Sequence, residues 1–351
     1  MAKHNYAAGP CVLPQDVFKK AAEGVLDLDG IGLSILEISH RSKEFIAIMD
    51  KAQALVKELL NVPEGYSVLF LQGGASLQFL MTPYNLLSTN GKAAYIDTGV
   101  WAKKAHKEAA ALGNVEVIAS SSDKNYNYIP KGVEIPSGLD YLHITTNNTI
   151  YGTQYKEYPT TDGLLVADMS SDIFSQKIDV SKFDLIYAGA QKNLGPAGAT
   201  LVIIKDEILG KGDRKIPSML DYQIHAKAGS MFNTPPVFSI YVAMLNLEYM
   251  KAQGGIEAIQ KNNEEKAAML YNEIDRNPLF VGSAEKEDRS NMNVCFLLTD
   301  ESKKEAFDKM WNDADINGIK GHRSVGGYRA SIYNALTKES IQALIDVMKK
   351  L

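Results

Sequence analysis

Residues 163–205 read GLLVADMSSDIFSQKIDVSKFDLIYAGAQKNLGPAGATLVIIK, and this stretch decides the fold class. It contains three short apolar runs, at 163–168, 184–190 and 199–205, which are separated by polar or glycine-rich segments. Short apolar runs of this kind are typical of strands that are buried on both faces, as in a mostly parallel sheet covered by helices. The first run ends at Asp168, and Gln191 and Lys192 follow the second, so polar groups stand where strands are expected to end.

The same pattern recurs on the N-terminal side of this stretch. Four more strand-like runs are SVLFL (67–71), KAAYID (92–97), VEVIA (115–119) and DYLHIT (140–145). A helix is predicted after Ser42, a suitable N-cap, because apolar residues recur at helical spacing from Phe45 to Leu59. Strands that alternate with helical or loop segments predict an α/β fold with a mostly parallel sheet.

The pattern changes after Pro235. Helical spacing covers 237–250 and 255–274, and strand-like runs follow at 293–298 and 328–335. Two further helices are predicted near 303–311 and over 339–351. We therefore expect an N-terminal arm over residues 1–15, a large domain over 16–250 and a smaller C-terminal α+β domain over 251–351.

The composition excludes several classes of protein. The chain has 351 residues, of which 45% are hydrophobic and 23% charged, and these ordinary globular values argue against wholesale disorder. A net charge of −5 without a basic stripe argues against nucleic acid as a partner, and no apolar run is long enough for a membrane helix. Cys11 and Cys295, the only cysteines, cannot form a disulfide framework or a thiolate zinc site, and no metal site is predicted. Because the start also lacks a secretory signal, we expect a cytoplasmic protein.

Polar residues at the predicted strand ends indicate a ligand site. In open α/β sheets, ligands bind at the carboxyl ends of the strands, where Asp168 and Lys192 are expected to share one crevice. A buried lysine can lose its proton and form an imine with an aldehyde such as that of pyridoxal phosphate. That cofactor also needs a carboxylate at its pyridinium nitrogen, a phosphate cradle and a surface for its ring. Asp168, the turn Gly73-Gly74-Ala75-Ser76 and Trp101 could supply these three, although each feature alone is common in proteins without a cofactor.

Arginines concentrate in two segments that predict anion binding. Only 6 of the 37 basic residues are arginine, and three of the six lie in HRS (40–42) and GHRSVGGYR (321–329). The planar guanidinium can bind a carboxylate or a phosphate with two parallel hydrogen bonds, which an ammonium cannot do. The pairs His40-Arg41 and His322-Arg323, together with Arg329, therefore predict a site for a substrate with two anionic groups. Surface ion pairs on separate elements are the alternative.

Eight segments of the chain, taken together and in this order, resemble the phosphoserine aminotransferases. They are HRS (40–42), GGAS (73–76), TGVWA (98–102), NNTIYGTQ (147–154), VADMSSDIFS (166–175), GAQKNLGPAG (189–198), NTPPVFSIY (233–241) and GHRSVGGYRASIYNA (321–335). The resemblance covers essentially the whole chain. It implies the aspartate-aminotransferase-like fold (fold type I of the pyridoxal-phosphate enzymes) within the class-V aminotransferases. It also implies pyridoxal 5′-phosphate as the cofactor and a homodimer with shared active sites.

The resemblance implies a role for each candidate residue. Lys192 would form a Schiff base with the cofactor, Asp168 would contact the pyridinium nitrogen and Trp101 would stack on the ring. The other cofactor contacts implied are Thr149 and Gln191 at its oxygens, Ala75 and Ser76 at its phosphate, and Asn233 and Thr234 from the other subunit. The substrate would be held at its α-carboxylate by Arg329 and at its distal anion by His40, Arg41, His322 and Arg323. Several family members have arginine where this chain has Ser76, so its phosphate site would rely on neutral donors.

The activity that the resemblance implies is transamination between glutamate and 3-phosphooxypyruvate, which gives O-phosphoserine and 2-oxoglutarate in serine biosynthesis. Whether phosphohydroxythreonine, a precursor of vitamin B6, is also a substrate stays open. The nearest alternatives are another class-V aminotransferase and a cysteine desulfurase, which needs a mobile, exposed cysteine. Cys295 lies in a strand-like run and Cys11 has no obvious activating neighbour. A dinucleotide-binding dehydrogenase would need the absent G-x-G-x-x-G fingerprint, and a regulator without enzyme activity would not need three arginines for a dianion.

Overall fold

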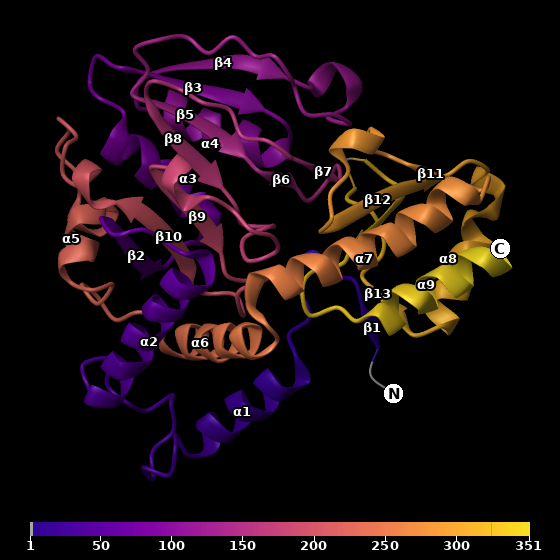
Figure 1. Ribbon diagram of the computed structural model, residues 1–351, viewed down its shortest axis with the longest axis horizontal. Coiled ribbons are helices and arrows are strands. Elements are labelled where there is room, and N and C mark those ends of the chain that lie inside the picture. The colour runs from indigo at the N-terminus through magenta and orange to yellow at the C-terminus, as the bar shows by residue number, and fades with distance from the viewer. Residues whose placement is uncertain (1–2, 324) are drawn as a thin grey trace.

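The computed structural model describes residues 3–323 and 325–351, so Met1 and Ala2 of the predicted arm and Ser324 of the segment 321–335 lie outside the described residues. The chain folds around a seven-stranded sheet, with a three-stranded sheet beside it (Figure 1). The strand order is β2-β10-β9-β8-β5-β3-β4. The strands are β2 (Tyr66–Leu71), β3 (Lys92–Asp97), β4 (Asn114–Ser120), β5 (Tyr141–Thr145), β8 (Leu164–Asp168), β9 (Leu185–Gly189) and β10 (Thr200–Lys205). β10 runs antiparallel to both neighbours and the other pairs are parallel, which confirms all seven predicted strands and a mostly parallel sheet.

Helices cover both faces of this sheet. They are α1 (Gln15–Leu26), α2 (Lys43–Leu60), α3 (Gly74–Leu86), α4 (Val100–Ala110), α5 (Tyr222–Lys227) and α6 (Val237–Ala252). The predicted helix after Ser42 is α2, and the Ser42 hydroxyl caps it by accepting a hydrogen bond from the backbone N–H of Phe45 (3.3 Å). α2 and α6 pack over one face of the sheet and α3 and α4 over the other. In β3, Ile96 accordingly belongs to the first core and Tyr95 to the second.

The C-terminal part has its own sheet and its own core. Its strands β11 (Phe280–Gly282), β12 (Asn293–Leu298) and β14 (Tyr328–Ser331) are antiparallel, and its helices are α7 (Gly255–Arg276), α8 (Lys304–Asp313) and α9 (Lys338–Lys350). Phe296, Phe307 and Tyr328 form an aromatic cluster within this core. The predicted domain boundary at residue 250 falls inside α6, and α7 begins in the core of the large sheet and ends in the core of the small one.

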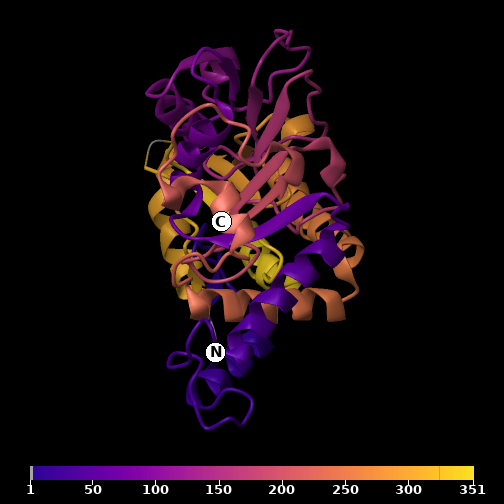
Figure 2. The same cartoon turned by 90° about the vertical axis from the view of Figure 1, so that its left-hand side faces the viewer.

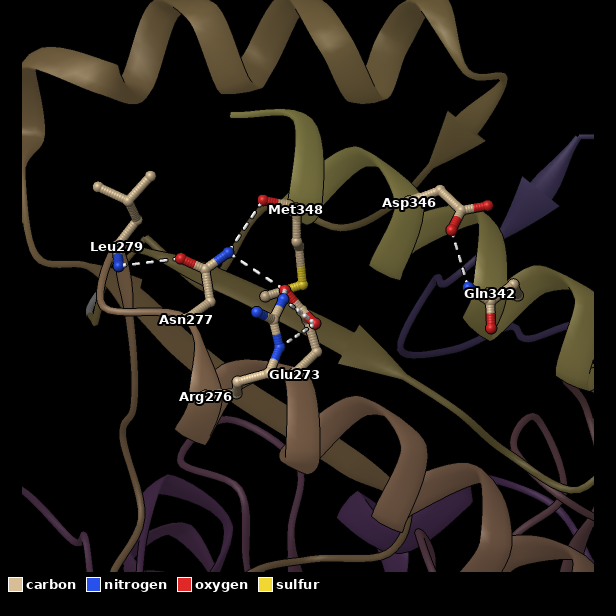
Figure 3. A network of polar contacts seen from close by, with 7 residues as sticks. All are labelled: Glu273, Arg276, Asn277, Leu279, Gln342, Asp346 and Met348. Carbon is tan, nitrogen blue, oxygen red and sulfur yellow. Dashed lines mark hydrogen bonds and ion pairs between the residues drawn. The ribbon is translucent and has the colours of Figure 1, made fainter.

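The last turn of α7 is joined to α9 by polar contacts (Figure 3). The side-chain amide of Asn277, which follows α7, donates to the backbone carbonyl of Met348 (3.0 Å) and to the carboxylate of Glu273 (3.2 Å). Arg276 donates to both oxygens of the same carboxylate. The bond from Asn277 to Met348 joins the end of α7 to α9, and the bonds to Glu273 hold the last turn of α7.

The N-terminal arm connects the two parts of the molecule. Its β1 (His4–Asn5) pairs in parallel with β13 (Ile316–Asn317), and the buried Tyr6 belongs to the core of the small sheet. Farther along, Cys11 contacts the turn after β9, and Leu13 belongs to the core of the large sheet. Among the described residues, no helix combines the length and apolar character needed to cross a bilayer.

Candidate active site

Most of the predicted cofactor residues lie just beyond the carboxyl ends of parallel strands. Asp168 is the last residue of β8, and Lys192 follows β9 by three residues. Trp101 follows β3 at the start of α4, and Thr149 follows β5 and the short hairpin strand β6 (Asn147–Asn148). The fold therefore gathers these side chains at one edge of the sheet, as the strand pattern predicts.

Lys192 is held in this crevice by its side chain and by its backbone. Its Nζ donates to the hydroxyl of Thr149 (3.0 Å). Its carbonyl oxygen accepts from the Sγ of Cys11 (2.7 Å), and the carbonyl of Gln191 accepts from the backbone N–H of Cys11 (3.1 Å). Burial lowers the pKa of Lys192 to about 8, although the nearby carboxylates of Asp168 and Asp172 act in the opposite direction. Near neutral pH a useful fraction of the amine is therefore uncharged and nucleophilic.

Asp168 presents a carboxyl group in an almost fully buried position, with 4% of the residue exposed. The backbone N–H of Ser170 donates to one of its oxygens (2.9 Å). Burial raises the pKa of Asp168, while the bond from Ser170 and the charge of Lys192 lower it. Within the described part of the chain no lysine or arginine forms an ion pair with Asp168. Such a buried carboxylate is suited to a cationic ring nitrogen.

The turn between β2 and α3 forms a cradle for an anion. Gly73 has φ = +85°, and a Cβ at this position would lie 2.5 Å from the side chain of Leu77, so only glycine fits. Ala75 and Ser76 are in the first turn of α3, where backbone N–H groups have no partner within the helix. The Ser76 residue is exposed, so its hydroxyl is accessible to a ligand.

Trp101 and Gln191 flank the crevice. The Trp101 ring is half-buried, and its indole N–H is buried with no hydrogen-bond partner among the residues that the structure describes. Lys104 lies over the same ring, 4.5 Å from its centre. The half-buried Gln191 side chain lies against Gly9 of the arm.

Arg329 lies on the small-sheet side of the crevice. It is in β14 opposite Cys295, and its charge lowers the pKa of Lys192, so the two cationic groups are near each other. The Nε of Arg329 is buried and has no hydrogen-bond partner within the described part of the chain. Burial, and then the charges of Arg329, Arg323 and Lys104, lower the pKa of His322. The structure therefore brings Arg329, His322 and Arg323 to one region near Lys192, with a guanidinium whose hydrogen-bonding capacity is not fully used.

His40 and Arg41 lie elsewhere. They belong to the segment between α1 and α2, which projects from the body of the protein in both Figure 1 and Figure 2. Arg41 is exposed, and no hydrogen bond or ion pair joins either side chain to the groups around Lys192 within the described residues. The predicted dianion site is thus only partly assembled in a single chain.

Asn233 and Thr234 lie beside the anion cradle. The carbonyl oxygen of Thr234 accepts a hydrogen bond from the side-chain amide of Gln72 (2.7 Å), and Asn233 lines a small cavity with Gly73. Thr234 is exposed. That this pair contacts the cofactor of the other subunit stays a prediction.

The two cysteines lack the features that a desulfurase needs. Cys295 is buried in β12, as expected, and its thiol donates to the carbonyl of Ile150 (3.4 Å). Burial raises the pKa of each thiol, Cys11 and Cys295, to about 12. Both sulfurs are therefore poor nucleophiles at neutral pH.

Two residues of the site were not anticipated from the sequence. Asp172 is a second buried carboxyl group near Asp168. The hydroxyl of Thr146 donates to the carboxylate of Asp172 and also lies within hydrogen-bond distance of the main-chain carbonyl of Asp168. The run VADMSSD contains both aspartates, four residues apart. The signal was therefore present, but only the fold shows that the second carboxyl turns inward.

The chain belongs to the class-V aminotransferase family. The model of that family matches residues 4–344. Among curated proteins, the chain is 63% identical to the phosphoserine aminotransferase of Flavobacterium psychrophilum, over 100% of this chain and 99% of the relative.

Solved structures agree with this assignment. The phosphoserine aminotransferase of Bacillus circulans subsp. alkalophilus is 43% identical, with a TM-score of 0.96 over 99% of this chain and 98% of that one. The pyridoxal-phosphate-bound phosphoserine aminotransferase of Trichomonas vaginalis is 34% identical, with a TM-score of 0.94 over 99% of each chain. An aspartate aminotransferase of Thermus thermophilus, 19% identical with a TM-score of 0.78 over 99% of each chain, shares the fold. The predicted fold class and family are confirmed, and the protein is an aminotransferase.

Proposed function

We propose that the protein transfers the amino group of glutamate to 3-phosphooxypyruvate, with pyridoxal 5′-phosphate as cofactor, and so produces O-phosphoserine and 2-oxoglutarate for serine biosynthesis. The observation that carries this proposal is the half-buried Lys192, whose pKa responds both to the carboxylates of Asp168 and Asp172 and to the incompletely bonded Arg329. This arrangement suits a cofactor aldehyde together with a substrate carboxylate. The name shared by relatives at 56–63% identity supports the choice of substrate.

The residues of the crevice fit the cofactor. The buried Asp168 carboxylate suits the ring nitrogen, Trp101 offers a ring face, and the cradle at Ala75 and Ser76 suits the phosphate. Thr149 and Gln191 would donate to its oxygens. When bound, pyridoxal phosphate supplies an aldehyde for the amino group and a ring that withdraws electrons from the substrate Cα.

The protein's own groups then move one proton and hold two anions. The Lys192 amine, whose pKa burial lowers to about 8, takes the proton from the substrate Cα and returns it on the cofactor side. Arg329 binds the α-carboxylate, which both amino acids share, through its planar fork. His322 and Arg323 lie near Arg329 and would bind the distal phosphate or carboxylate. One site thus handles both substrates in turn, which predicts ping-pong kinetics.

We further propose a homodimer in which each chain completes its partner's site. Large apolar side chains are exposed on and around the projecting segment, including Leu26 (83% exposed), Leu36 (62%) and Leu33 (49%). Such a group of exposed apolar side chains is typical of a protein interface. A second copy that covers this surface would bring His40 and Arg41 to another chain, where they could bind the distal anion. Asn233 and Thr234 would reach the partner's cofactor phosphate.

The proposal is tested by incubating the purified protein with O-phosphoserine and 2-oxoglutarate and measuring glutamate formation. We expect rapid turnover with O-phosphoserine and at least about a hundredfold lower kcat/KM with serine, which cannot bind the distal cations. Phosphohydroxythreonine is assayed alongside as the second phosphorylated donor. Equal turnover of serine and O-phosphoserine would contradict the proposed substrate class.

A further inference from the structure

Lys266, which the steps proposed above do not use, is completely buried beside the segment that follows β14. It lies in α7 and is 0% exposed. Its Nζ donates to the main-chain carbonyl oxygens of Ile332 (3.0 Å), Tyr333 (2.7 Å) and Asn334 (3.4 Å). A protonated lysine has three donors, and these three carbonyls match them. Lys266 therefore fixes the backbone of residues 332–334, although burial lowers its pKa to about 7.

The segment 332–334 connects the strand of Arg329 to the turn of Lys192. It directly follows β14 and thus continues the strand that carries Arg329. At its end, the backbone N–H of Asn334 donates to Oδ1 of Asn193 (3.1 Å), and Asn193 is the neighbour of Lys192 in the chain. This hydrogen bond joins the strand of the proposed carboxylate ligand to the turn of the proposed reacting amine.

The side chain of Asn334 is held by the same helix. Asn263 precedes Lys266 by three residues and therefore lies on the same side of α7. Its side-chain amide donates to Oδ1 of Asn334 (2.8 Å), while the Asn334 amide donates to the main-chain carbonyl of Phe174 (3.0 Å), in the loop after β8. α7 thus holds the segment after β14 by its backbone and by a side chain, and the segment in turn bonds to loops of the large sheet.

The turn of Lys192 is held independently of α7. The side-chain amide of Asn246, in α6, donates to the main-chain carbonyls of Asn193 (2.9 Å) and Leu194 (2.8 Å). These bonds remain when α7 loses its contacts with the segment after β14. Loss of the buried ammonium should therefore displace that segment rather than the turn of Lys192.

We propose that Lys266 is a positioning residue for the substrate: by fixing the segment after β14, it aligns the Arg329 guanidinium with the Lys192 amine. The carboxylate and the Cα of the substrate are then held in the geometry that proton transfer needs. This inference rests on the proposed function, in which Arg329 binds the α-carboxylate. Lys266 acts through Arg329 and is assigned no contact with the substrate.

The test is the affinity of the pyridoxal-phosphate-loaded protein for glutarate, measured by calorimetry. Glutarate has both carboxylates of glutamate but no amino group, so it binds without reacting. Lys266→Met removes the three donors and keeps an unbranched side chain. We expect its Kd for glutarate to rise about tenfold, because a displaced guanidinium fork no longer matches the carboxylate. For the same reason, kcat/KM should fall about tenfold for glutamate and for O-phosphoserine alike.

A second background shows whether the effect passes through Arg329. In a chain that already carries Arg329→Lys, the change Lys266→Met should raise the Kd by less than about a further twofold, because the fork that Lys266 positions is gone. A merely structural role would weaken glutarate binding equally in both backgrounds. The cofactor absorbance of Lys266→Met should equal that of the wild-type chain, since the turn of Lys192 stays in place.

Two further variants complete the comparison. Lys156→Met is the matched control, because Lys156 also donates to a main-chain carbonyl, that of Arg289 (2.7 Å), and its Kd for glutarate should equal that of the wild-type chain. Asn263→Ala removes the donor to the Asn334 side chain and leaves the buried ammonium in place. It should weaken glutarate binding in the same direction as Lys266→Met, and it carries the test if Lys266→Met fails to fold.

An unchanged Kd in both Lys266→Met and Asn263→Ala, or equal losses with and without Arg329→Lys, would overturn the role of Lys266 and leave the proposed function intact. No glutamate formation from O-phosphoserine and 2-oxoglutarate by the wild-type chain would overturn the proposed function, and the inference with it. The two failures are distinguishable, because only the second abolishes turnover by the unaltered protein.

Discussion

The edge of the large sheet around Lys192 and the segment between α1 and α2 both carry residues of the proposed site, but the chain surrounds them very differently. Around Lys192 and Asp168, neighbours from the arm and from strand ends bond the polar groups, and Asp168 is almost fully buried. Arg41, in contrast, is exposed on a segment that projects from the molecule. One chain brings together nearly all the residues proposed for the cofactor, but it leaves Arg41, which is proposed for the substrate, apart from them.

This difference indicates a division of labour. Preparation of the Lys192 amine needs a low-polarity surrounding, which a single chain can build by burying it. Recognition of a distal phosphate needs cations that remain accessible until the substrate arrives. We therefore expect severe effects from changes at the buried edge and smaller, substrate-specific effects from changes in the projecting segment.

The largest effect is expected from Lys192→Ala. The variant should lose transamination altogether, because the amine proposed to bind the cofactor covalently and to move the Cα proton is gone. It should still fold and bind pyridoxal phosphate without a covalent bond, which the absorption spectrum would show. Lys205→Ala, at the opposite edge of the sheet where Lys205 pairs with Asp184 (2.8 Å), is the control and should keep its activity.

Arg329→Lys should have the next largest effect. The substitution keeps the charge and loses the planar fork. The activation free energy that corresponds to kcat/KM should therefore rise by about 2–5 kcal/mol for glutamate and for O-phosphoserine alike. The matched control is Arg276→Lys, which alters an arginine at the end of α7 that donates to both carboxylate oxygens of Glu273. A loss confined to one of the two amino acids would show that Arg329 does not bind their common carboxylate.

Arg41→Ala should have a moderate effect that depends on the substrate. We expect kcat/KM for O-phosphoserine to fall by about 10- to 100-fold, since one charge-assisted contact to the phosphate is lost. The slow reaction with alanine, which has no distal anion, should not change. Lys43→Ala removes a neighbouring exposed cation and serves as the control. Equal losses with alanine and O-phosphoserine would point to damaged folding instead.

The smallest effect concerns stability and pH at the buried edge. The pKa of Asp172 is raised to about 7 by burial, so the folded state keeps a proton that the unfolded state releases near pH 4. Its contribution to stability is therefore full at acid pH and is lost as the pH rises through about 7. The free energy of unfolding should fall by about 1–2 kcal/mol more between pH 5 and 7 in the wild-type apoprotein than in Asp172→Asn. Denaturant titrations at both pH values measure the free energy of unfolding. An equal change between pH 5 and 7 in the two proteins would contradict the prediction.

The sequence predicts the buried edge well because its signals are local. Apolar runs such as 164–168 are bounded by polar residues, and the position of Asp168 and Lys192 after such runs is enough to expect a shared crevice. The antiparallel direction of β10 was not predicted, since a strand buried on both faces has the same pattern in either direction.

Features that depend on distant contacts were beyond the sequence pattern. The pairing of β1 with β13, and the contact of Cys11 with the Lys192 carbonyl, join residues far apart in the chain. The exposed position of Arg41 was also not apparent, because the helical spacing that follows it predicts α2 but not the direction in which the preceding segment points. The features that the sequence did not predict are those that depend on contacts between distant segments rather than on local propensity.

The most direct test of the shared site is to mix two variants with different defects and to assay them with O-phosphoserine. A Lys192→Ala chain has no catalytic amine but an intact Arg41, and an Arg41→Glu chain has the converse defect. If each site takes Lys192 from one chain and Arg41 from the other, a mixed dimer contains one site with both defects and one with neither. Random reassociation makes about half of the dimers mixed, so about a quarter of the sites should be intact and the activity should exceed the sum of the two parents. Activity no greater than the sum of the parents would contradict the account, because each chain would then depend on its own Arg41.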